Sequence, residues 1–163
     1  MKITFAAFPL LLLIASLAQA QVGGTVCYQP SARCSTSHSF TPYQLPFVIK
    51  EKLVFGKSYR SQQFYAVILK SVKIDPNADC SEVGEAERLK AQSIWPTRKV
   101  FTSRYSCPEE LVSYENTEPS VNFLAVYAGP SLAEARRVLN EAKAKGHLQA
   151  YIKRTRVVLD YST

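Results

Sequence analysis

The chain has 163 residues, including 20 Lys or Arg, 13 Asp or Glu and four Cys, with a formal net charge of +7. This composition excludes a disordered chain, a coiled coil, a collagen and an integral membrane protein. Residues 3–20 carry no charge and end in Ala18-Gln19-Ala20, which predicts a signal peptide over 1–20, cut before Gln21. The alternative is a retained anchor helix, but the apolar run is short for a bilayer span. We expect an exported protein, secreted or periplasmic, without a membrane anchor after cleavage.

The four cysteines predict two disulfides, because an exported chain meets an oxidising compartment. Cys27 and Cys34 lie close together in a segment rich in Pro, Ser and Thr, so we expect them to pair. Cys80 and Cys107 then pair by elimination. A four-cysteine zinc site is the competing interpretation, but it favours Cys-x-x-Cys spacings, which the sequence lacks. We therefore expect no metal and no cofactor.

Residues 21–61 are expected to form an N-terminal arm. Its first part, up to Pro46, is rich in Gly, Pro, Ser and Thr and predicts a loop. Two short apolar runs, 47–49 and 53–55, flank three charged residues and predict a hairpin. This hairpin leads into a long strand over 64–74.

Helices and strands alternate in the rest of the chain. Ser81 predicts the cap of a helix that carries Val83, Ala86 and Leu89 on one face and ends before Pro96. A strand over 98–105, a loop over 106–119 and a strand over 121–128 follow.

The clearest helix signal begins at Ser131. Ser131 and Glu134 have the spacing of a capping box, in which the two side chains bond amides of the first turn. Gly146 predicts the end of this helix, and a final strand is expected over 148–159. The predicted apolar face of the helix consists of Leu132, Ala135, Val138, Leu139 and Ala142.

The order strand, helix, strand, strand, helix, strand over residues 62–158 predicts an α+β, ferredoxin-like βαββαβ fold. In this fold two helices cover one face of an antiparallel four-stranded sheet. The N-terminal arm and hairpin are additions to it. The chain also repeats itself, because Phe64-Tyr65-Ala66-Val67 matches Phe123-Leu124-Ala125-Val126.

Side-chain alternation separates the two faces of the central strands. Tyr65, Val67, Leu69, Leu124, Val126 and Ala128 are expected to pack under the helices. The opposite face then shows Phe64, Ala66, Ile68, Lys70, Phe123, Ala125 and Tyr127. These aromatic rings form a stacking surface if the face is open. If the N-terminal arm covers it, they form a second core instead.

Three motifs of the second half are similar to those of SPOR domains, the sporulation-related repeats that bind bacterial peptidoglycan. The strand end Val126–Ser131, the helix start Glu134-Ala135-Arg136 and the segment Lys145–Ile152 carry the resemblance. It implies a non-catalytic module whose partner is the glycan strands of peptidoglycan. Together with the alternation of the strands, it predicts glycan binding by Phe64, Ile68, Lys70, Phe123, Tyr127 and Arg154. Arg98, Arg104 and Arg154 are weaker candidates than the others, because the register of their strands is not readable from the sequence.

No catalytic motif accompanies these features. His38 and His147 have no acid in a recognisable arrangement, so we expect no catalytic residues and no enzymatic activity. A weaker alternative is an enzyme that brings distant carboxylates together. The basic stretch over 143–156 suits an anionic polymer or a solvated surface. Export argues against a nucleic-acid partner. The runner-up function is a secreted protein-interaction domain of the same fold, with its sheet face covered or repurposed and cell-envelope proteins as partners.

Overall fold

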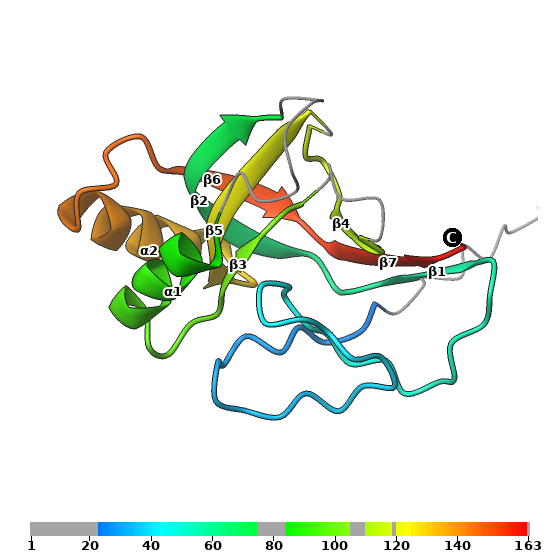
Figure 1. The fold of residues 1–163 in the computed structure, drawn as a ribbon. Coiled ribbons are helices and arrows are strands. Elements are labelled where there is room, and N and C mark those ends of the chain that lie inside the picture. The colour runs from blue at the N-terminus through cyan, green and yellow to red at the C-terminus, as the bar shows by residue number, and fades with distance from the viewer. Residues whose placement is uncertain (1–22, 75–83, 105–109, 119, 163) are drawn as a thin grey trace, which may run out of the picture.

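The computed structural model describes residues 23–74, 84–104, 110–118 and 120–162 (Figure 1). Within these ranges the protein is an α+β structure of two helices and seven strands in two antiparallel sheets. The strand orders are β3-β5-β2-β6 and β1-β7-β4. In chain order the elements are β1 (Lys57–Arg60), β2 (Phe64–Lys73), α1 (Glu85–Ile94), β3 (Val100–Thr102), β4 (Val112–Tyr114), β5 (Val121–Gly129), α2 (Leu132–Ala144), β6 (Tyr151–Thr155) and β7 (Val157–Tyr161).

The centre of the four-stranded sheet is the antiparallel pair β2 and β5, in which Val67 lies opposite Val126. Both valines are fully buried under the helices, in a cluster that includes Ala135 and Val138 of α2. β-branched residues favour such central strands because they pack well on a pleated surface. The predicted helix-facing side of both strands is therefore confirmed at these positions.

Helix α2 begins after the predicted cap Ser131, but only the serine half of the predicted capping box forms, because the Glu134 carboxylate bonds the Ser131 hydroxyl rather than an amide. The Ser131 Oγ accepts a hydrogen bond from the Glu134 amide at 3.2 Å, and the Ser131 hydroxyl donates to the Glu134 carboxylate at 3.0 Å. Gly146 follows the helix with a φ of 95°, a conformation that costs glycine little because it has no Cβ. The predicted apolar face is confirmed at Ala135, Val138 and Ala142, which are buried, and at Leu139, which packs against the same cluster, but it is wrong at Leu132, which is 41% exposed.

Helix α1 differs from its prediction. It begins at Glu85, and the expected cap Ser81 lies outside the described residues. Leu89 is 53% exposed and Ala86 is also exposed, whereas Arg88 is buried, so the predicted apolar face is wrong at both positions; its third member, Val83, lies outside the described residues. Steps of three residues drift away from the 3.6-residue helical period. Burial of Arg88 is possible because its guanidinium donates hydrogen bonds to the Glu85 carboxylate and the Val100 carbonyl.

Two long chain segments join the two sheets. The segment that holds β1 and β2 runs antiparallel to the segment that holds β6 and β7, with Tyr59 opposite Leu159 and Phe64 opposite Thr155. The predicted final strand is therefore interrupted at Arg156, where the chain passes from one sheet to the other.

The second sheet also corrects the predicted hairpin. Residues 47–55 form no strand, and β1 pairs with β7 near the end of the chain instead. Strand β4 lies in the stretch predicted to be a loop and pairs with β7 from the other side. The partner of β1 lies about 100 residues further along the chain, so a local sequence pattern does not indicate this pairing.

The N-terminal arm, residues 23–56, crosses the molecule beneath both sheets (Figure 1). Isolated bridges hold it, one between Gly24 and Ser61 and one between Val26 and Phe47. A Cβ at Gly24 would lie 2.2 Å from the Val48 carbonyl oxygen, so only glycine allows this approach.

The predicted disulfide between Cys27 and Cys34 is present in the arm, with Cα atoms 5.6 Å apart. It closes a short loop beside the bridge that Val26 makes to Phe47. The second expected pair, Cys80 and Cys107, lies outside the described residues.

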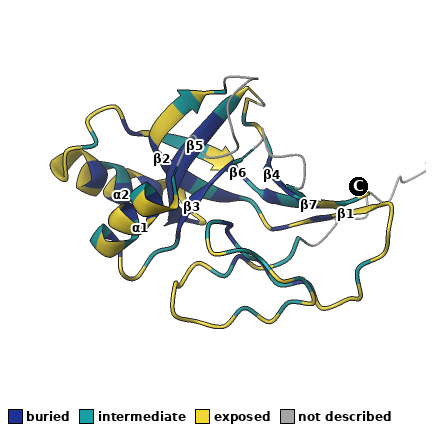
Figure 2. Cartoon of the chain, in the orientation of Figure 1, coloured by how far each residue is buried: buried dark blue, intermediate teal, exposed yellow. Residues whose placement is uncertain are grey.

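The arm and the second sheet cover the sheet face that lies opposite the helices. Figure 2 shows dark-blue, buried positions along the inner strands of both sheets. One cluster joins the arm and both sheets, and its aromatic members are Phe47, Tyr59, Phe64, Phe101, Tyr114, Phe123 and Tyr127. The expectation of an open face is therefore wrong for most of the sheet, and the alternative of a second core is confirmed.

Candidate functional site

Four of the six residues expected to bind glycan have buried side chains. Phe64, Ile68, Phe123 and Tyr127 are 1%, 2%, 4% and 3% exposed, respectively. They pack among other core rings, as in the 5.4 Å separation between the Phe64 and Tyr127 centroids. Their burial follows from the cover that the arm and the second sheet provide. These rings are therefore core residues rather than the expected stacking surface.

Lys70 lies on the helix side of the sheet, so its predicted place on the open face is wrong. A β-bulge between Ile68 and Lys70 sets Lys70 opposite Leu124. One extra residue in a strand shifts the alternation of every side chain beyond it. The Lys70 ammonium donates hydrogen bonds to both carboxylate oxygens of Glu87, at 3.1 and 3.0 Å.

Arg154 is exposed on the edge strand β6, but it also lies on the helix side. Its guanidinium is 6.0 Å from the centroid of the Tyr65 ring, and Tyr65 packs against the helix-side core. The six predicted residues therefore do not share one surface.

A small part of the predicted face remains accessible beside β6. This hollow, of about 310 Å³, has Ile68 and Phe123 at its base. Tyr151 is 48% exposed there, and its hydroxyl lies 3.2 Å from the Ser71 hydroxyl. We call it the β6 hollow.

A second hollow combines aromatic and polar side chains where the arm passes the end of β5. Its volume is about 490 Å³. The Tyr28 ring stacks on the Tyr127 ring, with centroids 4.9 Å apart and an interplanar angle of 11°. Tyr28 is 40% exposed, so it covers Tyr127 and presents its own ring to solvent. We call this site the Tyr28–Tyr127 pocket; its other side chains include Gln29, Gln62, Arg98 and Glu134.

Backbone hydrogen bonds tie the main chains of Tyr28 and Tyr127 to Lys99, the residue before β3. The Lys99 amide donates to the Tyr28 carbonyl at 2.6 Å, and the Lys99 carbonyl accepts from the Tyr127 amide at 3.0 Å. The neighbouring Cys27 amide donates to the Pro46 carbonyl at 2.9 Å, and Cys27 is tied by its disulfide. The pocket is therefore held in place before any ligand arrives.

The electrostatics of the pocket keep the Tyr127 hydroxyl neutral. The pKa of Tyr127 is raised to about 12, mainly by burial and then by the nearby Glu134 carboxylate and Tyr28, against the opposing effect of Arg98. Glu134 approaches the end of β5 because residue 129 is glycine, where a Cβ would lie 2.6 Å from the Glu134 carboxylate.

The pocket offers an exposed aromatic ring with amide, guanidinium, hydroxyl and carboxylate groups around it. Such a set suits a ligand with apolar C–H faces and many hydroxyl groups. Across the described ranges there is no cluster of three or more His, Cys, Asp or Glu that could hold a metal ion. No helix within them is long and apolar enough to cross a membrane.

Sequence reasoning identified only part of this pocket. Tyr127 was expected to bind as part of an open sheet, and Arg98 follows from the sequence only as a cation of uncertain register. Glu134 is predicted to bond an amide of the first turn of α2, but its carboxylate accepts from the Ser131 hydroxyl instead. Tyr28 was missed, since a single tyrosine in a loop-rich segment gives no periodic signal; its position next to Cys27 was the one available clue.

The chain matches no family model, and no match was found among curated proteins or solved structures.

Proposed function

We propose that the protein is an exported, non-catalytic domain that binds glycan strands of peptidoglycan in the Tyr28–Tyr127 pocket. The observation that carries this proposal is the exposed Tyr28 ring, stacked on Tyr127 and fixed by backbone hydrogen bonds. Sugars present C–H faces that stack on aromatic rings, and the surrounding polar groups can bind their hydroxyls. The proposed glycan site therefore lies at the end of β5 and not on the covered sheet face that the sequence predicts.

The arrangement of the four-stranded sheet supports this assignment. The order β3-β5-β2-β6, with both helices on one side, agrees with a ferredoxin-like domain. The resemblance to SPOR domains includes the segment Val126–Ser131, and three of its residues, Tyr127, Gly129 and Pro130, line the pocket. The signal-like residues 1–20 and the disulfide support export to an oxidising compartment.

Sedimentation with purified sacculi tests the proposal. We expect the protein, beginning at Gln21, to sediment with sacculi and to bind more after amidase has removed the stem peptides. Tyr28→Ala should weaken binding about tenfold, the loss of a well-placed aromatic anchor. Phe55, an exposed aromatic residue at a turn of the arm, provides the matched control, since Phe55→Ala should bind like the wild type.

A third variant separates the two accessible hollows. Tyr151→Ala removes the exposed ring of the β6 hollow and should leave binding unchanged. If Tyr151→Ala loses binding and Tyr28→Ala does not, the glycan lies in the β6 hollow and the proposed site is wrong.

The covered sheet face favours a second candidate, a secreted domain that binds another envelope protein. The observation behind it is the burial of Phe64, Phe123 and Tyr127 in a shared core. Failure of the wild-type protein to sediment with either sacculus preparation would exclude glycan binding and leave this second candidate.

A further inference from the structure

Strand β1 lies at the edge of its sheet. It is the end strand of the three-stranded sheet, and its one strand neighbour is β7. The Ser61 amide donates to the Val157 carbonyl at 2.9 Å, so antiparallel alternation turns the backbone groups of Ser58 and Arg60 away from β7. The Arg60 carbonyl accepts from the Gly24 amide at 2.9 Å. Beyond this bond, no strand within the described ranges pairs with the outer edge of β1.

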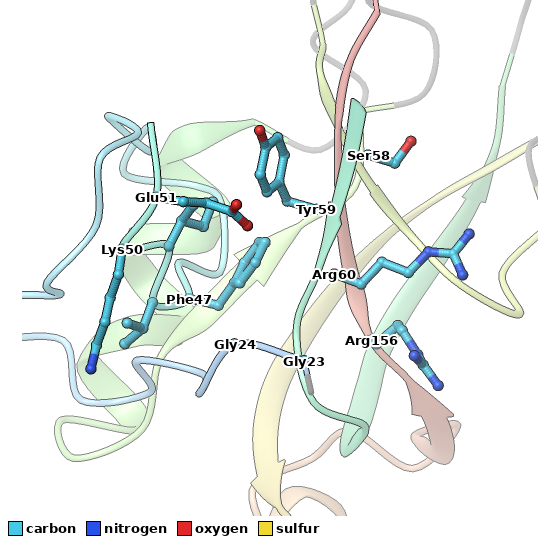
Figure 3. A pocket seen from close by; sticks show the side chains of 11 residues that line it. Gly23, Gly24, Phe47, Lys50, Glu51, Ser58, Tyr59, Arg60 and Arg156 are labelled. Atoms are coloured by element: carbon cyan, nitrogen blue, oxygen red, sulfur yellow. The ribbon is translucent and has the colours of Figure 1, made fainter. Parts of the chain in front are cut away.

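A groove runs along this edge. It has a volume of about 440 Å³ and lies between β1 and the arm segment that begins at Phe47 (Figure 3). Its two sides differ in chemistry, because side chains of a strand alternate between faces. Figure 3 shows Tyr59 and Phe47 on one side of β1, and Ser58, Arg60 and Arg156 on the other.

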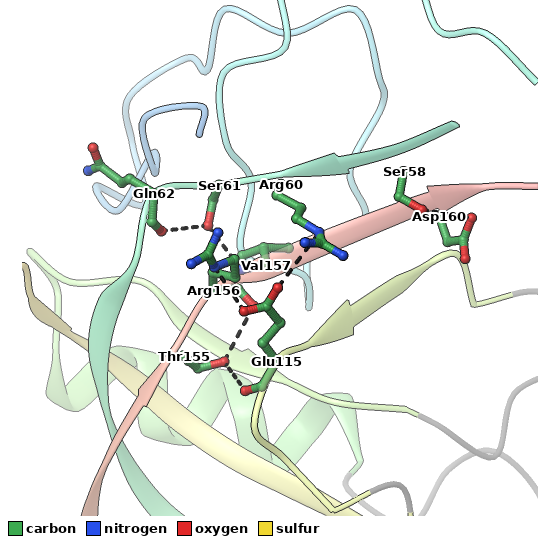
Figure 4. A network of polar contacts seen from close by, with 9 residues as sticks. All are labelled: Ser58, Arg60, Ser61, Gln62, Glu115, Thr155, Arg156, Val157 and Asp160. Carbon is green, nitrogen blue, oxygen red and sulfur yellow. Dashed lines mark hydrogen bonds and ion pairs between the residues drawn. The ribbon is translucent and has the colours of Figure 1, made fainter. Parts of the chain in front are cut away.

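Two carboxylates lie near Arg60 and Arg156 on this side of the groove, and one of them, Asp160, accepts a hydrogen bond from the Ser58 hydroxyl at 3.3 Å. The Glu115 carboxylate lies between Arg60 and Arg156 (Figure 4), with its oxygens 3.7 Å from the Arg60 Nε and 2.9 Å from the Arg156 Nε. Two guanidinium groups therefore share one carboxylate. The Arg60 side chain is 48% exposed and that of Arg156 is 25% exposed, so both remain accessible to a further anion. Guanidinium groups favour carboxylates because they offer several N–H donors in one plane.

We propose that the β1 edge binds an extended peptide segment of a partner protein, in which acidic and apolar residues alternate. The added strand pairs its backbone with the amide and carbonyl of Ser58 and with the amide of Arg60, since the Arg60 carbonyl is already bonded to Gly24. Its acidic side chains reach Arg60 and Arg156, while its apolar side chains pack toward Tyr59 and Phe47. This site is separate from the Tyr28–Tyr127 pocket and does not depend on the glycan proposal.

The outward-pointing amide and carbonyl groups of β1 favour a peptide as the ligand of this edge. A strand edge presents amide and carbonyl groups at a fixed repeat, which an extended peptide matches residue by residue. The two sides of the groove also differ, since Arg60 and Arg156 lie on one side of β1, whereas the Tyr59 and Phe47 rings lie on the other, beside Lys50 and Glu51 (Figure 3). The bridge between Gly24 and Ser61 marks where the added strand stops, since the edge is already occupied there.

Calorimetric titration of the protein beginning at Gln21 with two synthetic peptides tests the proposal. The first is an acetylated and amidated hexapeptide that alternates glutamate and valine, and the second alternates lysine and valine. We expect the first peptide to bind and the second not to bind. Arg60→Gln should weaken binding of the first peptide about tenfold, the loss of one charge-assisted hydrogen bond.

Substitutions of Ser58 test strand addition itself. Ser58→Pro removes an amide that points away from β7, and edge strands tolerate proline, so the melting temperature should stay close to that of Ser58→Ala. Ser58→Pro should abolish binding of the glutamate–valine peptide, whereas Ser58→Ala should retain it. Equal binding by the two Ser58 variants would overturn strand addition. Binding of the lysine–valine peptide as strongly as the glutamate–valine peptide, or binding of neither, would overturn the proposal.

Discussion

Ser61 and Val157 are joined by two hydrogen bonds at the point where both long segments pass from one sheet to the other. The Ser61 amide donates to the Val157 carbonyl, and the Val157 amide donates to the Ser61 Oγ, each at 2.9 Å. Both residues are fully buried. The serine hydroxyl therefore replaces a backbone acceptor where the regular ladder is interrupted.

Ser61→Ala should destabilise the protein by about 1–3 kcal/mol, because it leaves the buried Val157 amide without an acceptor. Urea unfolding followed by circular dichroism measures the free energy of unfolding. Ser58→Ala, an exposed change three residues away, should stay within about 0.5 kcal/mol of the wild type. Equal stability of the two variants would show that water or a shifted backbone satisfies the Val157 amide.

Tyr127→Ala should lower stability by about 3–5 kcal/mol, because it removes a ring that is 97% buried from the core between arm and sheet. An open sheet face would instead leave stability nearly unchanged. Val126→Ala, on the helix side, should also destabilise, by about 1–3 kcal/mol. Thermal melts compare the two, and Tyr127→Phe, which keeps the ring, should melt close to the wild type. A wild-type melting temperature for Tyr127→Ala would show that the arm does not cover this face.

The parts of the fold that sequence predicts well are those set by local patterns. Strands β2 and β5 follow from runs of apolar, β-branched residues, and α2 follows from the cap at Ser131 and the stop at Gly146. Each signal lies within about 15 residues of chain. A short internal repeat, residues 64–67 and 123–126, also marks these two strands as equivalent.

The parts that sequence misses depend on distant partners or single irregularities. Strand β1 is specified by its pairing with β7, which no local pattern shows. One bulged residue places Lys70 under the helices. The position of Tyr28 depends on the hydrogen bond that its carbonyl accepts from the Lys99 amide and on the disulfide of the neighbouring Cys27. Both the covered face and the candidate pocket follow from these non-local contacts.

Stability should rise between about pH 8 and pH 10 through Lys99. Burial, and then the nearby Arg88, lower the pKa of Lys99 from 10.5 to about 8, against a smaller opposing effect of Glu85. In this window the unfolded chain holds more protons on Lys99 than the folded chain does, so the free energy of unfolding increases with pH. Below about pH 8 the folded protein carries the full cost of the buried charge.

Lys99→Met removes this contribution, as well as the hydrogen bond that the Lys99 ammonium donates to the Pro42 carbonyl. The difference in free energy of unfolding between wild type and Lys99→Met should shift in favour of the wild type from pH 8 to pH 10. Urea titrations at several pH values measure it. A difference that stays constant across this range would show that Lys99 titrates alike in both states.

Removal of the Cys27–Cys34 disulfide should weaken both stability and ligand binding. The bond closes a loop with a sequence separation of 7, for which the chain-entropy model gives about 2–3 kcal/mol of stabilisation. Cys27→Ser combined with Cys34→Ser should lower the free energy of unfolding by this amount. Because Tyr28 follows Cys27 directly, the double variant should also bind sacculi less well at temperatures where it is fully folded.

Arg33→Ser, an exposed change inside the same loop, provides the control and should alter neither property. Circular dichroism and sacculus sedimentation on the same preparations measure both effects. If the double variant unfolds earlier but binds sacculi like the wild type, the disulfide stabilises the arm without positioning the Tyr28 ring.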